Sequence, residues 1–261
     1  MLWLAIGLFG CGSALREARE PHAGARVLTV ATFNLYFPAS GDAETLETVG
    51  KTGADVIFLQ EVSPAWEGVL RQRYGSAYPH MLFAPAGGAG GLGVLSRFAL
   101  SQDGLLPAQM KHPAWLVRVH TPGAEVRVLN VHLRASRRRG QGLLPGLFSM
   151  GSDHRREIAA FVAACGGPPT LVVGDFNEGP EGPAIDWLER RGFVNALPRH
   201  DPGQPTFRAI AGLVRLPLDH ILFDGSLEAI DSWVLRSGNS DHWPVLARFE
   251  LPSAPRVTAA R

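Results

Sequence analysis

The sequence predicts one α/β domain in which helices flank two packed, mostly antiparallel sheets. Three observations lead to this fold class. Short apolar runs of strand character recur along the 261 residues, a tight turn at Pro122-Gly123 joins two of them, and amphipathic helices separate others. Strands outnumber helices, which is typical of a sandwich with helices outside paired sheets. No stretch of linker composition divides the body of the chain, so we expect a single domain.

The expected strands are short apolar runs rich in β-branched and aromatic residues. They cover residues 26–33, 54–59, 80–84, 92–96, 114–120, 125–133, 170–173, 218–223, 227–235 and 244–250. The first helix, at 42–51, has Asp42 as its N-cap, and the second begins at Ser63-Pro64, a serine cap followed by proline. In the third, at 152–164, apolar residues recur three or four positions apart, and 183–190 completes the helices.

The composition is that of a folded globular protein, with 46% hydrophobic and 19% charged residues. The formal net charge is +1, so a basic surface for a polyanion must be local rather than global. Cys11 and Cys165 are the two cysteines, which excludes a disulfide framework and a cysteine zinc site within the body of the chain. Cys165 closes a helical pattern, and we expect it to be a buried, small apolar residue.

The N-terminal segment has features of an export signal. Residues 1–8 are nearly all apolar, but a bilayer span takes about 20 such residues. Leu8-Phe9-Gly10-Cys11 resembles a bacterial lipoprotein cleavage box, in which the cysteine receives the lipid. We expect a signal plus tether at 1–25, the domain at 26–251 and a flexible tail at 252–261. The protein then works outside the cytoplasm, secreted or lipid-anchored. If the apolar run is not a signal, the protein is cytoplasmic.

Polar residues stand at the ends of several apolar strands, and a polar side chain in such a position calls for a structural or functional explanation. They are Asn34, Glu61, His132, Asp175 with Asn177, Asp219, and Asp241-His242. Strand alternation puts Asp219 and His220 on opposite faces, so at most one of them joins a given site. Each fragment alone is explained as a turn, a cap or a hydrogen-bonded histidine. Their recurrence at the same kind of strand end favours one shared site.

These residue types suit the hydrolysis of a phosphate ester. A phosphodiester is anionic, so catalysis needs positive charge on the phosphoryl oxygens and a well-placed water. Glu61 fits as a ligand of Mg²⁺, which prefers carboxylate oxygens, and Asp175 can orient or deprotonate the water. A protonated histidine can stabilise an oxygen or assist the leaving group, and Asp219 can orient His242 in that role.

The motifs resemble those of the endonuclease–exonuclease–phosphatase superfamily, which includes pancreatic deoxyribonuclease. The matching stretches are Thr32-Phe33-Asn34, Leu59-Gln60-Glu61-Val62, Gly93-Val94-Leu95-Ser96-Arg97, Asn130-Val131-His132-Leu133, Gly174-Asp175-Phe176-Asn177, Leu218-Asp219-His220-Ile221-Leu222 and Ser240-Asp241-His242-Trp243-Pro244-Val245. Gly-Asp-Phe-Asn and Ser-Asp-His-x-Pro-Val are the most specific of them. One feature departs from the pattern: between Ser96 and Asn130 we cannot match the aromatic or acidic residue that many nucleases carry.

The resemblance implies a four-layer α/β sandwich with the site at one rim of the two sheets. It implies Mg²⁺ (or Mn²⁺) held mainly by Glu61, with Asn34 and Asp241 nearby. The catalytic residues that it implies are Asp175 and Asn177 for the water, His132 for the leaving group or phosphate, and the Asp219–His242 pair as a phosphate clamp. Arg155 matches a frequent arginine near the site, although a solvated helix face explains it equally well. His220 occupies a variable position.

The substrate is the open question. Arg134, Arg137, Arg138 and Arg139 follow His132 and can hold flanking phosphates of a nucleic acid, but a solvated charged loop is the alternative. Residues 142–151 are apolar without a clear period, which fits core packing or an exposed loop at a membrane. We expect a nuclease. The alternatives are a lipid or inositol head-group phosphodiesterase or phosphatase similar to sphingomyelinase, and a non-catalytic binding protein. We expect a monomer that meets a membrane only through the possible anchor.

Overall fold

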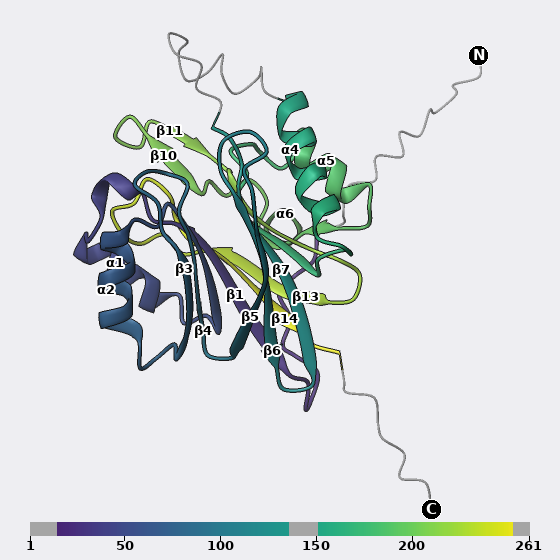
Figure 1. The fold of residues 1–261 in the computed structure, drawn as a ribbon. Helices are drawn as coiled ribbons and strands as arrows, with labels where there is room; N and C mark the ends of the chain where they lie inside the picture. Colours follow the sequence, from purple (N-terminus) through teal and green to yellow (C-terminus); the bar gives the residue numbers. More distant parts are fainter. Residues whose placement is uncertain (1–14, 136–150, 253–261) are drawn as a thin grey trace, which may run out of the picture.

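Two six-stranded sheets packed face to face form the centre of the molecule, and helices cover their outer surfaces (Figure 1). The structure is a computed structural model that describes residues 15–135 and 151–252. In Figure 1 the helices α1 and α2 lie at the left of the paired sheets, and α4 and α5 lie at the upper right. This arrangement confirms the predicted four-layer α/β sandwich.

The first sheet has the strand order β13-β14-β1-β2-β4-β3. Its strands are β1 (Val27–Asn34), β2 (Val56–Gln60), β3 (His80–Ala84), β4 (Leu92–Ser96), β13 (Glu228–Val234) and β14 (Val245–Glu250). Only β1 and β2 pair in parallel in this sheet, and the other neighbours are antiparallel. The parallel pair sets Asn34 opposite Gln60. The residue after Gln60, Glu61, therefore emerges at the same sheet edge as Asn34.

The second sheet has the order β5-β6-β7-β8-β12-β9. Its strands are β5 (Ala99–Leu106), β6 (Ala114–Thr121), β7 (Ala124–His132), β8 (Leu171–Asp175), β9 (Val194–Asn195) and β12 (Asp219–Phe223). The parallel pair β7–β8 aligns His132 with Asp175, and the antiparallel pair β8–β12 aligns Asp175 with Asp219. Three of the predicted site residues are thus neighbours in one row across the sheet.

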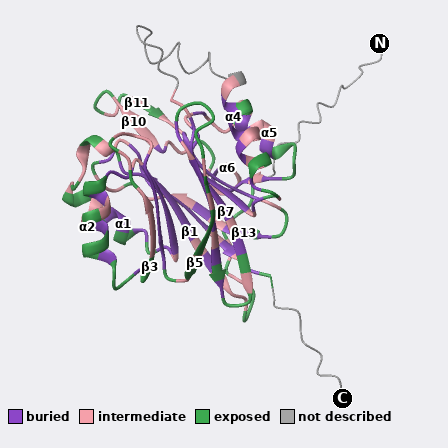
Figure 2. Cartoon of the chain, viewed as in Figure 1, coloured by how far each residue is buried: buried purple, intermediate pink, exposed green. Residues whose placement is uncertain are grey.

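Most strands are buried on both faces, which is why they appear in the sequence as unbroken apolar runs (Figure 2). Phe58 of β2, Val128 of β7 and Phe249 of β14 belong to the core between the sheets. Trp66 belongs to the outer core of the first sheet, and Phe161 to that of the second. The helices are α1 (Ala43–Lys51), α2 (Pro64–Tyr74), α4 (Gly151–Ala164), α5 (Pro183–Glu189) and α6 (Ala196–His200).

The predicted helix starts are made by the predicted caps. Asp42 Oδ1 accepts a hydrogen bond from Thr45 N at 2.7 Å, and Ser63 Oγ accepts one from Trp66 N at 3.1 Å. Each cap satisfies a backbone N–H group that the helix itself leaves unpaired. Cys165 is free and buried, as the sequence predicted.

Several short or exposed elements were not predicted. They are β5, β9, α6, the 3-10 turn Phe37–Ala39, and the hairpin of β10 (Phe207–Ala209) and β11 (Val214–Leu216). Strand β5 carries polar residues, is largely exposed and is interrupted by a bulge near Gly104, so it lacks the apolar alternation of a buried strand. The hairpin strands have three residues each, too few for a periodic pattern.

The segment that precedes β1 lies against the domain. Arg16 N donates to Arg199 O at 2.8 Å and Arg19 N to Ile230 O at 3.0 Å, and Arg19 also pairs with Glu250 at 2.6 Å. Part of the predicted tether thus contacts α6, β13 and β14. The predicted signal run, Cys11 and nearly all of the predicted tail lie outside the described residues. Within the described residues, no helix has the length and apolar character to cross a membrane.

Candidate active site

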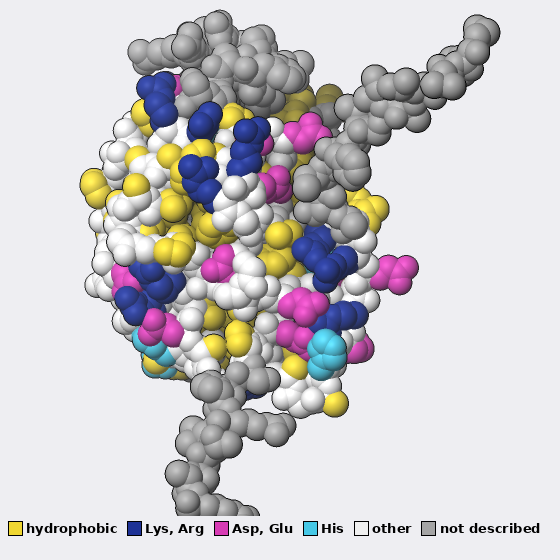
Figure 3. Space-filling model, turned by 90° about the vertical axis from the view of Figure 1, so that its right-hand side faces the viewer, with side chains coloured by type: hydrophobic (Ala, Val, Ile, Leu, Met, Phe, Trp, Pro, Cys, Tyr) yellow, Lys and Arg dark blue, Asp and Glu magenta, His cyan; other side chains and the backbone are white. Residues whose placement is uncertain are grey.

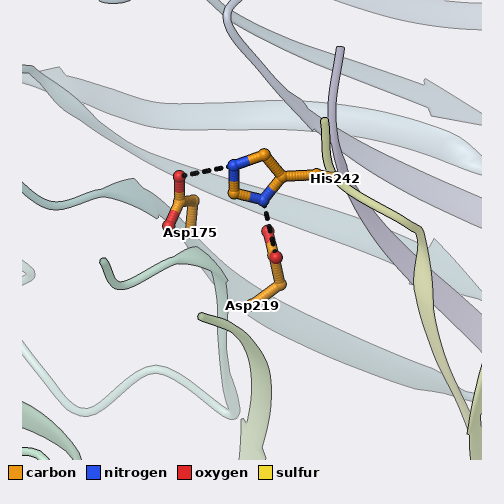
Figure 4. A group of neighbouring side chains, drawn as sticks. All are labelled: Asp175, Asp219 and His242. Carbon is orange, nitrogen blue, oxygen red and sulfur yellow. Dashed lines mark hydrogen bonds and ion pairs between the residues drawn. The ribbon is translucent and has the colours of Figure 1, made fainter. Parts of the chain in front are cut away.

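Asp175, the last residue of β8, occupies the centre of the candidate site. Its side chain is buried, and its Oδ2 accepts a hydrogen bond from Asn34 Nδ2 at 3.1 Å. The same oxygen lies 3.5 Å from His132 Nε2 and 3.7 Å from His242 Nε2. In Figure 4, Asp175 and Asp219 approach different nitrogens of the His242 ring. One carboxylate oxygen thus faces two imidazoles and an amide.

The glycine before Asp175 is required by the backbone. Gly174 has φ +140°, and a Cβ at this position would come within 1.9 Å of Val131 O on the neighbouring strand. Any side chain would push β8 away from β7. The close approach keeps His132 and Asp175 in register, which gives the glycine of Gly-Asp-Phe-Asn a structural reason.

His242 and Asp219 form a hydrogen-bonded dyad, as the resemblance implied. His242 Nδ1 donates to Asp219 Oδ2 at 2.7 Å. Thr206 Oγ1 accepts from the backbone N–H of Asp219 at 3.0 Å, and Ser240 Oγ accepts from that of His242 at 3.1 Å. Burial lowers the pKa of His242, but Asp219 and Asp175 outweigh it and raise that pKa to about 10. His242 is therefore an imidazolium at neutral pH.

Glu61 and Asn34 share a tightly organised corner beside the dyad. Glu61 has φ 59°, an uncommon conformation for a non-glycine residue. Its Oε1 accepts from Asn34 Nδ2 at 3.2 Å and its Oε2 from Phe37 N at 3.0 Å. Asn34 Oδ1 accepts from Tyr36 N at 3.0 Å, which fixes the orientation of the amide. Here Asn34 donates to two carboxylates, so it positions Glu61 and Asp175 relative to each other.

The residues that fit a divalent cation best are Glu61 and Asp241. Both line the same cavity, and Asp241 Oδ1 is buried without a hydrogen-bond partner among the described residues. Burial, with Glu61 and Asp175 adding to it against the pull of His242, raises the pKa of Asp241 to about 6. A carboxylate oxygen without a protein partner, in a cavity that a second carboxylate also lines, is a donor set that Mg²⁺ or Mn²⁺ accepts.

A second group of possible ligands is less suitable. Asp175, Asp219 and His242 offer ligand atoms that lie within 4.8 Å of one another. His242 Nδ1, however, needs its proton for the bond to Asp219, and the ring is charged at neutral pH. An imidazolium has no lone pair for a metal, so we assign these three residues to a hydrogen-bonded network instead.

Asn177 lies next to Asp175, and its side chain binds a backbone carbonyl rather than pointing to Asp175. Its N–H donates to Asp175 Oδ1 at 2.8 Å, and its Nδ2 donates to Leu133 O at 2.9 Å. Asn177 adopts φ 51°, which this short polar residue tolerates better than most. The arrangement fixes Asp175 Oδ1 and leaves Oδ2 toward the cavity.

The predicted residues surround one open cavity of about 440 Å³. Its wall includes Glu61, His132, Asp175, Asn177, Asp241 and His242, together with apolar groups from the β10–β11 hairpin. Among the wall residues that were not predicted is a third histidine. His112, in the segment between β5 and β6, stacks on His132. It lies in the interval where no family residue could be matched. A lone histidine in an irregular segment carries no signal in the sequence.

Of the predicted arginines, the two that the structure describes do not line this cavity. Among the described residues, Arg155 is exposed on α4, and Arg134 is half-buried with its N–H bonded to Glu157. Neither lines the cavity, although Ala135 does. Arg137, Arg138 and Arg139 lie outside the described residues. Figure 3 shows Lys and Arg side chains in separate groups on one face, with acidic groups among them, rather than as one basic stripe.

His220 points away from the site, as the strand alternation predicted. Its ring contacts the Phe176 ring at 5.6 Å, and its two nitrogens bond to Asn195 and to Glu178 O. Burial lowers the pKa of His220. It is a structural histidine behind the sheet.

Acidic groups thus lie beside buried imidazoles at the rim of the four-layer sandwich. Residues 31–242 match the model of the Endonuclease/Exonuclease/phosphatase family. The chain belongs to this family, whose members hydrolyse phosphate esters. No curated protein sequence matches the chain closely enough to count as a relative.

Solved structures agree on the fold. A humanized D. rerio TDP2 superposes with a TM-score of 0.65 at 17% identity, covering 86% of this chain and 99% of that one. The human Nocturnin catalytic domain gives 0.62 at 16% identity, with 90% and 100% covered. The 3′ phosphatase NExo from Neisseria, bound to a product DNA hairpin, gives 0.58 at 16% identity, with 85% and 99% covered.

Proposed function

We propose that the protein is a divalent-metal-dependent phosphodiesterase that acts on nucleic acid. The position of Asp175 carries the proposal, because its Oδ2 lies within reach of both imidazole Nε2 atoms, at 3.5 and 3.7 Å. Glu61 and Asp241 line the same cavity. A phosphate bound there meets a fixed positive charge and a carboxylate that can take a proton from water.

Asp175 is the proposed base. Burial raises its pKa and Asp219 adds to this, while His242 and His132 oppose it, so the carboxylate is a stronger base than one in water. The backbone N–H of Asn177 holds Oδ1, and Oδ2 is left to orient the attacking water. A divalent cation, when bound at Glu61 and Asp241, supplies positive charge to the phosphoryl oxygens.

The two histidines take different roles. His242, charged through its bond to Asp219, stabilises a non-bridging oxygen of the phosphate. His132 Nδ1–H donates a hydrogen bond to Ala89 O at 3.0 Å, which leaves Nε2 facing the cavity. In its doubly protonated form the ring carries a second proton on Nε2, and that proton can pass to the leaving oxygen. Asp219 orients His242 in the way a carboxylate orients a catalytic histidine elsewhere.

Two observations support a nucleic acid as the substrate. Structures that share this fold include a D. rerio TDP2 with a single-strand DNA product and the Neisseria phosphatase with a DNA hairpin. The aromatic side chains of Tyr36, Phe37 and Phe207 line the same cavity as Glu61 and Asp241. Aromatic faces next to a phosphate site suit the stacking of bases.

A lipid head group is the second candidate, and one observation favours it. The tip of the β10–β11 hairpin exposes Ile210 by 64% and Leu213 by 84%. Phe207 and Leu216 of the same hairpin line the cavity. Exposed apolar side chains at the mouth of a site suit contact with a membrane surface.

The experiment that separates the candidates offers each substrate to the full chain with Mg²⁺. Supercoiled plasmid, single-stranded DNA, RNA and phosphatidylcholine–sphingomyelin vesicles are tested with and without EDTA. Cleavage of a nucleic acid that EDTA abolishes is expected. Turnover of vesicles alone would move the assignment to the lipid candidate, and equal rates with and without EDTA would contradict metal dependence.

A further inference from the structure

His112 covers one face of the His132 ring. The two imidazole centroids are 4.4 Å apart and the rings are inclined by 15°, which is a stacked arrangement. His112 is 4% exposed and lines the cavity beside His132. It comes from the segment between β5 and β6, whereas His132 ends β7. The contact therefore joins an irregular segment to a strand end of the site.

The stack completes the fixation of His132. The Nδ1–H of His132 donates to Ala89 O at 3.0 Å, and Nε2 lies 3.5 Å from Asp175 Oδ2. A single hydrogen bond in the ring plane leaves the ring free to tilt about that bond. A flat group packed on the face removes this freedom, because a tilted His132 ring would overlap with the ring of His112.

One ring nitrogen of His112 is left unsatisfied by the described part of the protein. Its Nε2 is buried and has no hydrogen-bond partner among the described residues. Burial, followed by the nearby His132 and Lys111, lowers the pKa of His112 to about 3, so the ring is neutral at neutral pH. A buried nitrogen without a partner lowers stability, which indicates that the flat ring is the useful part of this side chain.

We propose that His112 is a positioning residue, whose stacked ring holds His132 in the plane that directs Nε2 toward the leaving oxygen of the substrate. The proposal rests on the proposed phosphodiesterase function. It predicts that losing the stack harms reactions whose leaving group needs a proton and spares those whose leaving group does not.

The test compares two thymidine diesters with Mg²⁺: the 4-nitrophenyl ester of thymidine 5′-phosphate and the dinucleotide TpT. Nitrophenolate leaves without a proton, whereas the alkoxide of TpT needs one. In His112→Ala, kcat for TpT should fall roughly 10- to 100-fold with little change in KM, as a misplaced catalytic group costs about that much. For the nitrophenyl ester, kcat should fall by only a small fraction of that factor. Equal losses on both substrates, or none, would overturn the proposal.

Two further variants separate stacking from packing. His112→Phe keeps a flat ring and removes the unpartnered nitrogen, so kcat for TpT and the melting temperature should stay close to those of the unaltered protein. His112→Leu keeps apolar bulk without a flat face and should lose kcat as His112→Ala does. Full activity in the Leu variant, or the loss in the Phe variant, would refute the stacking role. His120→Ala, an exposed histidine of β6, is the matched control.

The last arm asks whether His112 acts through His132. In a His132→Ala background, His112→Ala should cause no further loss, whereas independent effects would add and contradict the proposal. Ring proton shifts of His132 give a readout without turnover. In His112→Ala they should move downfield as the facing ring is removed, and unchanged shifts would show that no stack exists. The ring shifts report the stack even if neither diester is a substrate, in which case the failure belongs to the proposed function and not to the contact between the two histidines.

Discussion

Asp219 Oδ2 and His242 Nδ1 are 2.7 Å apart, and both side chains are buried. The pair joins β12 of one sheet to the segment before β14 of the other. The dyad is therefore assembled only when the two sheets pack, so the charge of His242 depends on the fold as a whole.

Removing this carboxylate should change the pH dependence as well as the rate. Against the effect of burial, Asp219 together with Asp175 raises the pKa of His242 to about 10. The imidazolium therefore persists until pH approaches that value, and activity falls above it. In Asp219→Asn, the alkaline limb of kcat should move to lower pH, and kcat at neutral pH should fall by about 10-fold or more. A pH–rate profile of both proteins checks this, and an unmoved alkaline limb would separate His242 from catalysis.

The dyad also contributes to stability, with a sign that follows from the raised pKa. The contribution is complete below pH 6.5, the ordinary value, and is lost as pH rises through about 10. The free energy of unfolding should therefore decline on the alkaline side in the unaltered protein. In His242→Asn this decline should be smaller. Urea titrations from about pH 6 to about pH 10 measure the difference. This range runs from the ordinary pKa of histidine to the raised pKa of His242.

A second buried histidine predicts another alkaline loss, outside the active site. His154 Nδ1 lies 2.8 Å from Glu178 Oε2 and His154 Nε2 lies 2.7 Å from Arg134 O. Both neighbours are acceptors, so the ring must carry two protons to bond to both. Burial opposes this, but Glu178 and the Arg134 carbonyl raise the pKa of His154 overall.

Replacing His154 should therefore destabilise the protein most at low and neutral pH. His154→Gln leaves Glu178 without its buried partner, which costs about 3–5 kcal/mol. The loss is largest below pH 6.5 and shrinks as pH rises through the raised pKa, because the native protein then loses the same interaction. Thermal unfolding at several pH values checks this, and a pH-independent difference would contradict the assigned charge.

Metal affinity should depend on the carboxylates of Glu61 and Asp241. Glu61→Gln and Asp241→Asn each remove one negative charge from the proposed cation site and should weaken Mn²⁺ binding by about 10-fold or more, since affinity follows ligand charge. Titration calorimetry or Mn²⁺ spectroscopy of each protein without substrate measures this in the absence of turnover and leaves Asp175 in place. Unchanged affinity in both variants would place the cation elsewhere, with the Asp175–Asp219–His242 group as the next candidate.

The site residues that could be predicted from the sequence lie at strand ends, and those that were missed reach the site only through tertiary packing. Asn34, His132 and Asp175 end unbroken apolar strands, so their positions were visible in the sequence, and the known motifs supplied the pairing of sheets. His112 was missed because it lies in an irregular segment and meets His132 only through tertiary packing. The hairpin that carries Phe207 was missed for a similar reason, as three-residue strands show no period.

The central claim is that Asp175 activates the attacking water in a metal-dependent phosphodiesterase. The most direct measurement is the rate of DNA cleavage with Mg²⁺ by the unaltered protein and by Asp175→Asn, which preserves the size of the side chain. The account predicts that the variant keeps its melting temperature within a few degrees and loses at least about 10²-fold in kcat. A folded Asp175→Asn protein that cleaves DNA at a near-normal rate would contradict it.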